Sequence, residues 1–417
     1  MSTIESNTLP CESVDVDNRQ KSLRQVEKTF RPVTVAMKFL GLYFGNPYSG
    51  VDLKENAVAP LNENCARTRV SWKEKFGKTY CLLVSLLLYA GFACSLSFTV
   101  RGVSYSFVAR RLTMDIWMLW CALQGTVCIL SISRRKNGSK FSSFIRALAC
   151  ADSNGFPPPS KLPKVIITIS IATVIFNNVL FMVLLHYSGV SSSFLFVLFG
   201  NENMTLAGPD GWVIAVYQVT LPFATSAWAF PSCFYMVTCI IVADRFSFLT
   251  KKAQDEFKST NHINMKQLRR DHLRLCHALE KLDEIISPLA LISYGCSIPE
   301  ICIALDVTIR MSREGYSIFI ISVIIFWSLI NISNTIVTSL AGAHINSTAH
   351  SLTSVVYDID VDELKDGEKT ELMLLLNKLN TEVISPTIGG IVPVTRGMLL
   401  TVFGTIIGYL TILVQFK

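Results

Sequence analysis

The chain has 417 residues, of which 50% are apolar and only 17% charged, and its formal net charge is +7. A soluble domain usually carries about 25% charged residues. Here the apolar residues gather into blocks long enough to cross a membrane. The chain is therefore poorly described as a soluble enzyme, a nucleic-acid binder or a secreted disulfide scaffold.

The first part of the chain, up to Thr79, is predicted to be a cytoplasmic region. Its first twenty residues are polar, whereas a cleavable signal places an apolar core within about 15–30 residues of the start. We therefore expect no cleavable signal. Within this region, Val33–Phe44 is apolar enough for a short helix that lies on the membrane or on the protein.

Seven apolar blocks follow, and each is long enough for about 20 helical residues, the length that spans a hydrocarbon core of about 30 Å. They predict an all-α, polytopic membrane protein with seven transmembrane helices. The blocks are Tyr80–Val100, Leu112–Ser133, Val165–Leu185, Trp212–Ala243, Ile285–Val307, Tyr316–Ala341 and Gly397–Phe416.

The distribution of Lys and Arg predicts how these spans are oriented. The N-terminal region and the loops after spans two, four and six carry 12, 7, 9 and 4 basic residues, which is 32 of the 38. The other loops and the C-terminus carry 6. Since basic residues prefer cytoplasmic loops, we expect the N-terminus inside and the C-terminus outside.

Two amphipathic segments on the cytoplasmic side are predicted to be helical. Met265–Glu284 places leucines on one face and leads straight into span five, and Thr370–Leu379 shows a similar pattern. Such helical extensions are expected to form a cytosolic anchor. Two interpretations remain open for it, packing within one subunit and a platform for oligomerisation.

The last span has a distinctive face. Its small or polar residues recur at spacings of 4, 3, 4, 3 and 4, which places them on one side of a helix. This face either lets another helix approach closely or borders water along a pore. The residues are Gly397, Thr401, Gly404, Gly408, Thr411 and Gln415.

The end of this span also resembles a known family. Gly408–Phe416, with the sequence GYLTILVQF, resembles the T-Y-x5-Q-F signature of arthropod gustatory receptors, the insect-type chemosensory channels of the odorant and gustatory receptor superfamily. The preceding Thr395–Ile406 and the segment Leu282–Leu289 are similar to the same family. Gly408 departs from the signature, which usually has Thr at this position.

The resemblance implies a tetrameric, ligand-gated, non-selective cation channel in which the last span lines a shared pore. It places Gln415 and Phe416 at the outer gate and Tyr409 in support of the pore helix, next to Gly408 and Thr411. The predicted domains are a cytoplasmic N-terminal region at 1–79, a six-span ligand-binding bundle with cytosolic helical extensions at 80–341, a cytosolic anchor segment at 342–396 and the pore-lining seventh span at 397–417. The subunits are expected to be identical or to include related receptors.

The ligand, a small tastant with a sugar slightly favoured, is expected in the outward half of the bundle. Apolar pockets with a few polar groups are typical of such sites. Glu300 stands out because an ionisable group inside a span usually faces a cavity or a partner. The other candidates also have structural interpretations, as interfacial aromatics or helix-bridging amides. The candidates are Asp115, Trp120, Gln124, Asn178, Tyr217, Gln218, Trp228, Glu300 and Trp327.

Other classes of protein receive less support from the sequence. No H-E-x-x-H, G-x-S-x-G or phosphate-binding G-x-x-x-x-G-K motif occurs, so we expect no enzyme, cofactor, metal or nucleic-acid partner. A membrane transporter and a metabotropic receptor remain alternatives. The expected location is the plasma membrane of chemosensory neurons, with membrane lipid and permeating cations as partners. Asn203-Met204-Thr205 is the glycosylation acceptor predicted to lie outside.

Overall fold

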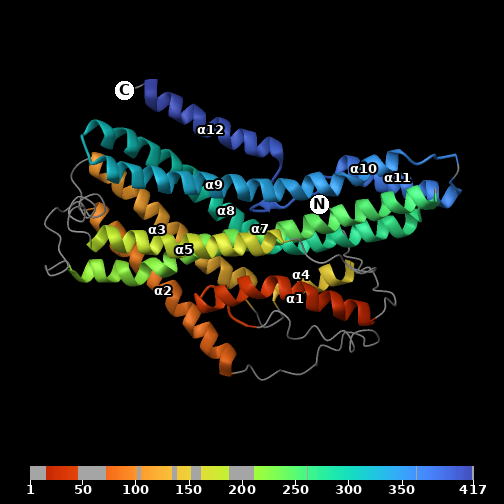
Figure 1. The fold of residues 1–417 in the computed structure, drawn as a ribbon, viewed down its shortest axis with the longest axis horizontal. Coiled ribbons are helices and arrows are strands. Elements are labelled where there is room, and N and C mark those ends of the chain that lie inside the picture. The colour runs from red at the N-terminus through yellow and green to blue at the C-terminus, as the bar shows by residue number, and fades with distance from the viewer. Residues whose placement is uncertain are drawn as a thin grey trace, which may run out of the picture.

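The computed structural model shows an elongated helical molecule (Figure 1). Within the described part of the chain, a single short hairpin accompanies the helices. The described residues are 16–45, 72–100, 105–133, 139–151, 161–186, 211–260, 262–362 and 364–415.

Six helices in this part of the chain are long and apolar enough to cross a membrane. Each contains the predicted apolar block to within two residues at its ends, so the number and order of the first six predicted spans are confirmed. They are α2 (Trp72–Val100), α3 (Tyr105–Ile132), α5 (Leu162–His186), α7 (Gly211–Thr260), α8 (Met265–Arg313) and α9 (Ile318–His350).

Three of these helices extend well beyond the thickness of a membrane. Helix α8 has 49 residues, or roughly 74 Å at 1.5 Å per residue, and it joins the predicted amphipathic segment Met265–Glu284 to span five without a break. Helices α7 and α9 run beside it (Figure 1). At the far end they meet α10 (Leu352–Tyr357) and α11 (Asp366–Thr381). These two helices and the Met265–Glu284 part of α8, which were predicted to form a cytosolic anchor, are called the anchor below.

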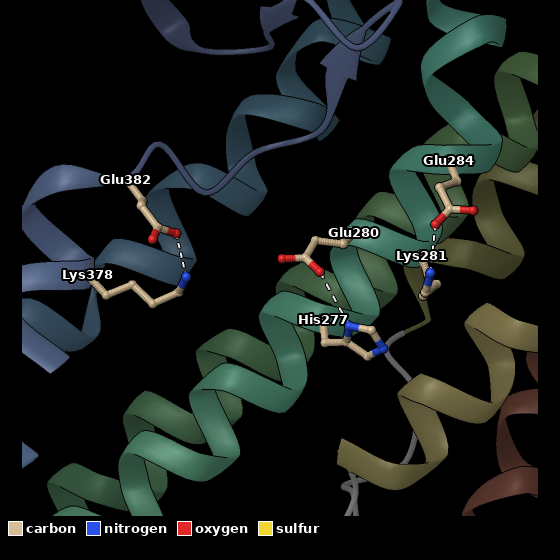
Figure 2. Close-up of polar contacts among 6 residues, drawn as sticks. All are labelled: His277, Glu280, Lys281, Glu284, Lys378 and Glu382. Atoms are coloured by element: carbon tan, nitrogen blue, oxygen red, sulfur yellow. Dashed lines mark hydrogen bonds and ion pairs between the residues drawn. The ribbon is translucent and has the colours of Figure 1, made fainter. Parts of the chain in front are cut away.

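Buried apolar side chains hold the anchor together, and ion pairs lie around them. Helix α11 buries Leu372, Leu375 and Leu379, the predicted apolar face. An ion pair between Arg269 and Glu371 joins α8 to α11. Figure 2 shows three further pairs, His277–Glu280, Lys281–Glu284 and Lys378–Glu382, and each joins residues about one helical turn apart. Such local pairs support single helices by a few tenths of a kcal/mol.

An aromatic cluster holds α1 (Val16–Phe39) and α4 (Lys140–Ala151) beneath α7. The Phe30 ring meets Phe141 edge-on at 5.5 Å, and both rings contact Phe234. Helix α1 begins before the predicted Val33–Phe44 segment and ends within it. It ends there because Gly41, at φ 71°, adopts the left-handed conformation that closes a helix.

A short hairpin links the anchor to the last helix. Strands β1 (Thr387–Ile388) and β2 (Val392–Pro393) are joined through Gly389 and Gly390, both with positive φ, and the Ile391 N–H closes the turn on the Ile388 carbonyl. Glycine adopts these angles without a steric penalty. The Gly389 N–H donates to the Ser287 carbonyl of α8 at 3.1 Å, so the hairpin is docked on the bundle.

Helix α12 (Arg396–Gln415) leaves this hairpin and runs back along the bundle. Figure 1 shows that it ends at the same end of the molecule as the turn between α8 and α9, opposite the anchor. It is apolar and has 20 residues, about 30 Å, which is sufficient for a seventh span.

Candidate functional site

A cavity of about 140 Å³ lies between five helices, in the half of the bundle away from the anchor. Its wall is mainly apolar, with three tryptophans and a few polar side chains. The lining comes from α3 (Thr113, Met114, Trp117), α5 (Thr173, Asn177, Phe181), α7 (Leu221, Trp228), α8 (Glu300, Ile301, Ala304, Val307) and α9 (Ile324, Trp327, Ser328, Ile330, Asn331).

Two tryptophan–asparagine pairs shape the wall. The Trp228 indole N–H donates to the Asn331 side-chain oxygen at 3.2 Å, which joins α7 to α9. The Trp327 indole N–H donates to Asn177 at 2.9 Å, which joins α9 to α5. Since each indole donor already has a protein partner, these tryptophans present flat apolar faces to the cavity.

Glu300 is the one acidic residue among the described residues that line the cavity. Its side chain is buried and hydrogen-bonds the Asn331 amide, while its Oε2 atom has no protein partner. No Lys, Arg or His occurs among the lining residues described. The cavity wall therefore contains a buried carboxyl with no cation beside it among the described lining residues.

The structure places the predicted ligand residues in several environments. Trp228, Glu300 and Trp327 line the cavity. Trp120 stands behind Trp228, edge to face at 6.4 Å between ring centroids. Asn178 instead donates to Thr225 of α7 at 3.0 Å.

Asp115 and Tyr217 lie in a separate polar cluster of α2, α3 and α7. The Asp115 carboxylate accepts hydrogen bonds from the hydroxyls of Ser95 and Thr99, the latter at 2.5 Å, and buried Arg111 donates to the Ser95 carbonyl at 2.5 Å. This network satisfies the Asp115 carboxylate within the protein and keeps it out of the cavity lining.

The two predicted glutamines also lie outside the cavity lining. The Gln218 amide approaches His186 at 3.5 Å near the surface. Gln124 is buried within the bundle, where its side-chain oxygen has no protein partner.

Sequence reasoning missed Thr113, Ser328 and Asn331 as cavity residues. Polar residues occur throughout these apolar blocks, and the sequence does not show how each helix is rotated. Asn331 had one usable signal, since an asparagine in the middle of a span needs a hydrogen-bond partner. That signal does not identify the partner.

On α12, the small and polar face points away from the bundle. Gly397, Thr401, Gly404, Gly408, Thr411 and Gln415 are all exposed, whereas Ile406 is buried against the bundle. Nothing in the described chain lies within 4 Å of a Cβ built on Gly404 or Gly408. The two glycines therefore do not serve close packing within the described part of this subunit.

The predicted pore and gate residues that the structure describes lie partly on the exposed face of α12 and partly against the bundle. Gly408, Thr411 and Gln415 are exposed, while Tyr409 is half-buried on the bundle side. The Thr411 hydroxyl donates to the Ile407 carbonyl at 2.9 Å, so it is satisfied within its own helix. Phe416 and the glycosylation acceptor Asn203 lie outside the described residues.

The arrangement of helices is similar to that of solved insect olfactory receptors. Olfactory receptor OR5 from Machilis hrabei in complex with eugenol matches with a TM-score of 0.66 at 14% sequence identity, over 95% of this chain and 100% of that one. A second solved structure of the same receptor, described without eugenol, matches with a TM-score of 0.65 at 13% identity, again over 95% of this chain and 100% of that one. No curated protein sequence matches the chain.

These features define an insect-type chemosensory receptor, an all-α polytopic membrane protein. Residues 195–417, more than half of the chain, match the model of the trehalose receptor family. The chain therefore belongs to that family, and the resemblance seen in the sequence is confirmed.

Proposed function

We propose that this receptor is a ligand-gated, non-selective cation channel opened by a small tastant. Four copies, identical or including related receptors, would surround one pore lined by α12. Gln415 and Phe416 would form the outer gate, and Tyr409 would hold α12 against its own bundle. The domain boundaries expected from the sequence give the corresponding parts: a bundle for the ligand, an anchor for assembly and α12 for permeation.

The observation that carries this proposal is the exposure of the small and polar face of α12. A face of glycine, threonine and glutamine gains little from contact with lipid. Its residues are exposed, and nothing in the described chain lies within 4 Å of a Cβ built on Gly404 or Gly408. Small residues allow close approach of helices, and threonine and glutamine offer oxygen atoms to passing cations. On a water-filled axis shared with other subunits, the small residues would let the neighbouring helices approach, and the oxygen atoms would face the cations.

The anchor offers a surface for the assembly. Its outer side exposes Tyr357, Met373 and Leu374, and the hairpin exposes Ile391 and Val392. Large apolar side chains that stay exposed outside the membrane-spanning part are suited to a subunit interface. This favours the oligomerisation platform over packing within one subunit alone.

The orientation completes the proposal. With the basic N-terminal region and the anchor in the cytoplasm, the cavity opens toward the outer half of the membrane, where a tastant arrives. We place the protein in the plasma membrane of chemosensory neurons. The family description favours a sugar as the ligand, since the matching model is that of a trehalose receptor.

Current recordings from cells that express the receptor test the function. Gln415→Ala and Phe416→Ala are expected to change ion selectivity or rectification while the ligand concentration for half-maximal response stays within about threefold. Glu280→Gln, an exposed change in the anchor, serves as the control. Unaltered selectivity in both gate variants would contradict the assignment of the gate.

A further inference from the structure

Helix α1 has two opposite faces. Its buried face packs on the bundle, where the Phe30 ring meets Phe141 of α4 and Phe234 of α7. Exposed residues recur on the other side at spacings of 4, 3, 4 and 4, which places them along one stripe of the helix. We call this set the outer stripe of α1. Its residues are Arg24, Lys28, Arg31, Val35 and Phe39.

The outer stripe changes from basic to apolar along the helix. Its first three residues are basic, and its last two, Val35 and Phe39, are 54% and 81% exposed. The only acidic residue between Arg24 and Phe39 in the sequence is Glu27, which is half-buried. Within the described chain, no ion pair joins the three basic residues of the stripe to a carboxylate. The stripe therefore carries net positive charge next to exposed apolar side chains.

Contacts at the end of α1 place the apolar part of the stripe at the level of the membrane. The Tyr80 hydroxyl, in the apolar span of α2, donates to the Phe39 carbonyl at 2.8 Å. Just beyond α1, the Phe44 N–H donates at 3.2 Å to the hydroxyl of Ser133, which follows α3. Figure 1 shows α1 running from there toward the anchor. Arg24 lies about 20 Å back along the helix from Phe39, so the basic residues are farther from the hydrocarbon.

The start of α2 extends this surface. Trp72 and Phe76 are exposed one helical turn apart, and Lys75 and Lys78 are exposed near them. Tryptophan is enriched where membrane meets water, and lysine stems lie along apolar surface while their ammonium groups stay in the polar layer. Two further lysines are exposed at the start of α5, which α1 also contacts. They are Lys161 and Lys164.

This surface lies on the lipid side of the proposed assembly. Figure 1 shows α1 and the start of α2 on the side of the molecule opposite α12. Since α12 is proposed to face an axis shared by the subunits, α1 lies on the outer perimeter, where lipid surrounds the protein. In the proposed orientation α1 is also on the cytoplasmic side, and the cytoplasmic leaflet carries anionic lipids.

We propose that the outer stripe of α1 and the start of α2 bind anionic phospholipids of the cytoplasmic leaflet. The three basic residues of the stripe pair with the charged headgroups, while Val35 and Phe39 contact the acyl chains. An acidic soluble protein would match the basic residues but not the apolar end of the stripe, which lies at the level of the membrane. The site is separate from the ligand cavity and from the proposed pore, and it rests on the proposed orientation only for the leaflet that it faces.

Lipid association with the purified full-length receptor tests the proposal without channel opening. The receptor is reconstituted in phosphatidylcholine bilayers, and electron paramagnetic resonance compares spin-labelled phosphatidylserine with spin-labelled phosphatidylcholine. Phosphatidylserine is expected to associate about twofold or more in excess, because basic residues near the surface attract anionic lipid. The preference should shrink in about 1 M salt, where the screening length is about 3 Å. Equal association of the two lipids at low salt would overturn the proposal.

Substitutions locate the preference on this surface. Arg24→Gln, Lys28→Gln and Arg31→Gln together should remove about half or more of the excess association. The matched control changes three exposed lysines at the anchor ends of α7 and α8 to glutamine and should keep the full preference. An unchanged preference in the α1 variant, or an equal loss in the control, would overturn the proposal. The control lysines are Lys251, Lys258 and Lys266.

Two further arms keep the test decisive. Lys75→Gln with Lys78→Gln leaves α1 intact and should also lower the preference, so a misfolded α1 variant does not end the test. Full preference in this variant would contradict the role of α2. Glycerophosphoserine, the headgroup without acyl chains, should displace little phosphatidylserine at millimolar concentration, and full displacement would show a site for soluble anions instead. Because no current is measured, failure of this proposal leaves the proposed channel function intact.

Discussion

Asp283 of α8 accepts two hydrogen bonds from Thr387, the first residue of the hairpin that precedes α12. The Thr387 backbone N–H lies 2.7 Å from one carboxylate oxygen, and its hydroxyl lies 2.6 Å from the other. Helix α8 also carries Glu300 in the cavity wall, so this contact connects the ligand site to the start of the proposed pore helix.

Removing that contact is expected to uncouple binding from opening. Hydrogen bonds to charged groups contribute about 1.5–3 kcal/mol each. Asp283→Leu should therefore reduce the maximal ligand-evoked current about tenfold or more at equal surface expression. Ligand affinity measured on purified receptor should change less than twofold, because Asp283 lies outside the cavity lining.

Thr387→Val provides the graded comparison. It removes the hydroxyl donor but keeps the backbone N–H, so its loss of current should fall between those of the parent and Asp283→Leu. A full-sized current in Asp283→Leu would show that the hairpin does not transmit the ligand signal through this contact.

The Asp115 cluster is expected to contribute to stability rather than to ligand recognition. Asp115→Ala leaves Arg111 and two hydroxyls in a buried site, and breaking such a network typically costs about 3–5 kcal/mol. Thermal unfolding of the purified receptor should show this loss, while the folded fraction keeps its ligand affinity.

Gln218→Ala is the control for this substitution, because its side chain makes only a 3.5 Å approach to His186 near the surface. It should change the free energy of unfolding by less than about 0.5 kcal/mol. An Asp115→Ala receptor of normal stability and lost ligand affinity would instead place Asp115 in the ligand site.

The orientation of the chain predicts where glycans attach. Asn203 precedes a threonine at the second position in a loop without Lys or Arg, whereas Asn346 lies on α9 near the anchor and donates to the Ile384 carbonyl. Single Asn→Gln variants should show by gel mobility that only Asn203 carries a sugar. A glycan on Asn346 would place the anchor outside the cell and reverse the proposed topology.

The sequence contained most of the information about the helices. Apolar blocks and leucine spacing predicted the six long helices and the amphipathic first half of α8, because burial in lipid or in a helical seam leaves a periodic signal. The ends of α7 and α9 were harder to predict. Beyond the membrane their helical turns continue through polar residues, and packing in the anchor rather than hydropathy determines where they stop.

The ligand site could be predicted only in part, for a physical reason. Glu300 was identifiable because an ionisable group in an apolar block needs a cavity or a partner. Asp115 met the same criterion, but the Ser95 and Thr99 hydroxyls of α2 satisfy it. Telling these cases apart requires the rotation of each helix, which hydropathy does not specify.

Accessibility of single cysteines along α12 in working channels tests the central claim most directly. With Gly408→Cys, Thr411→Cys and Gln415→Cys, a charged thiol reagent applied from outside should block the ligand-evoked current more than it blocks that of the parent. Ile406→Cys, on the buried side of the same helix, should be unaffected. Block at Ile406→Cys with none at the other three positions would show that the small and polar face of α12 does not line the ion path.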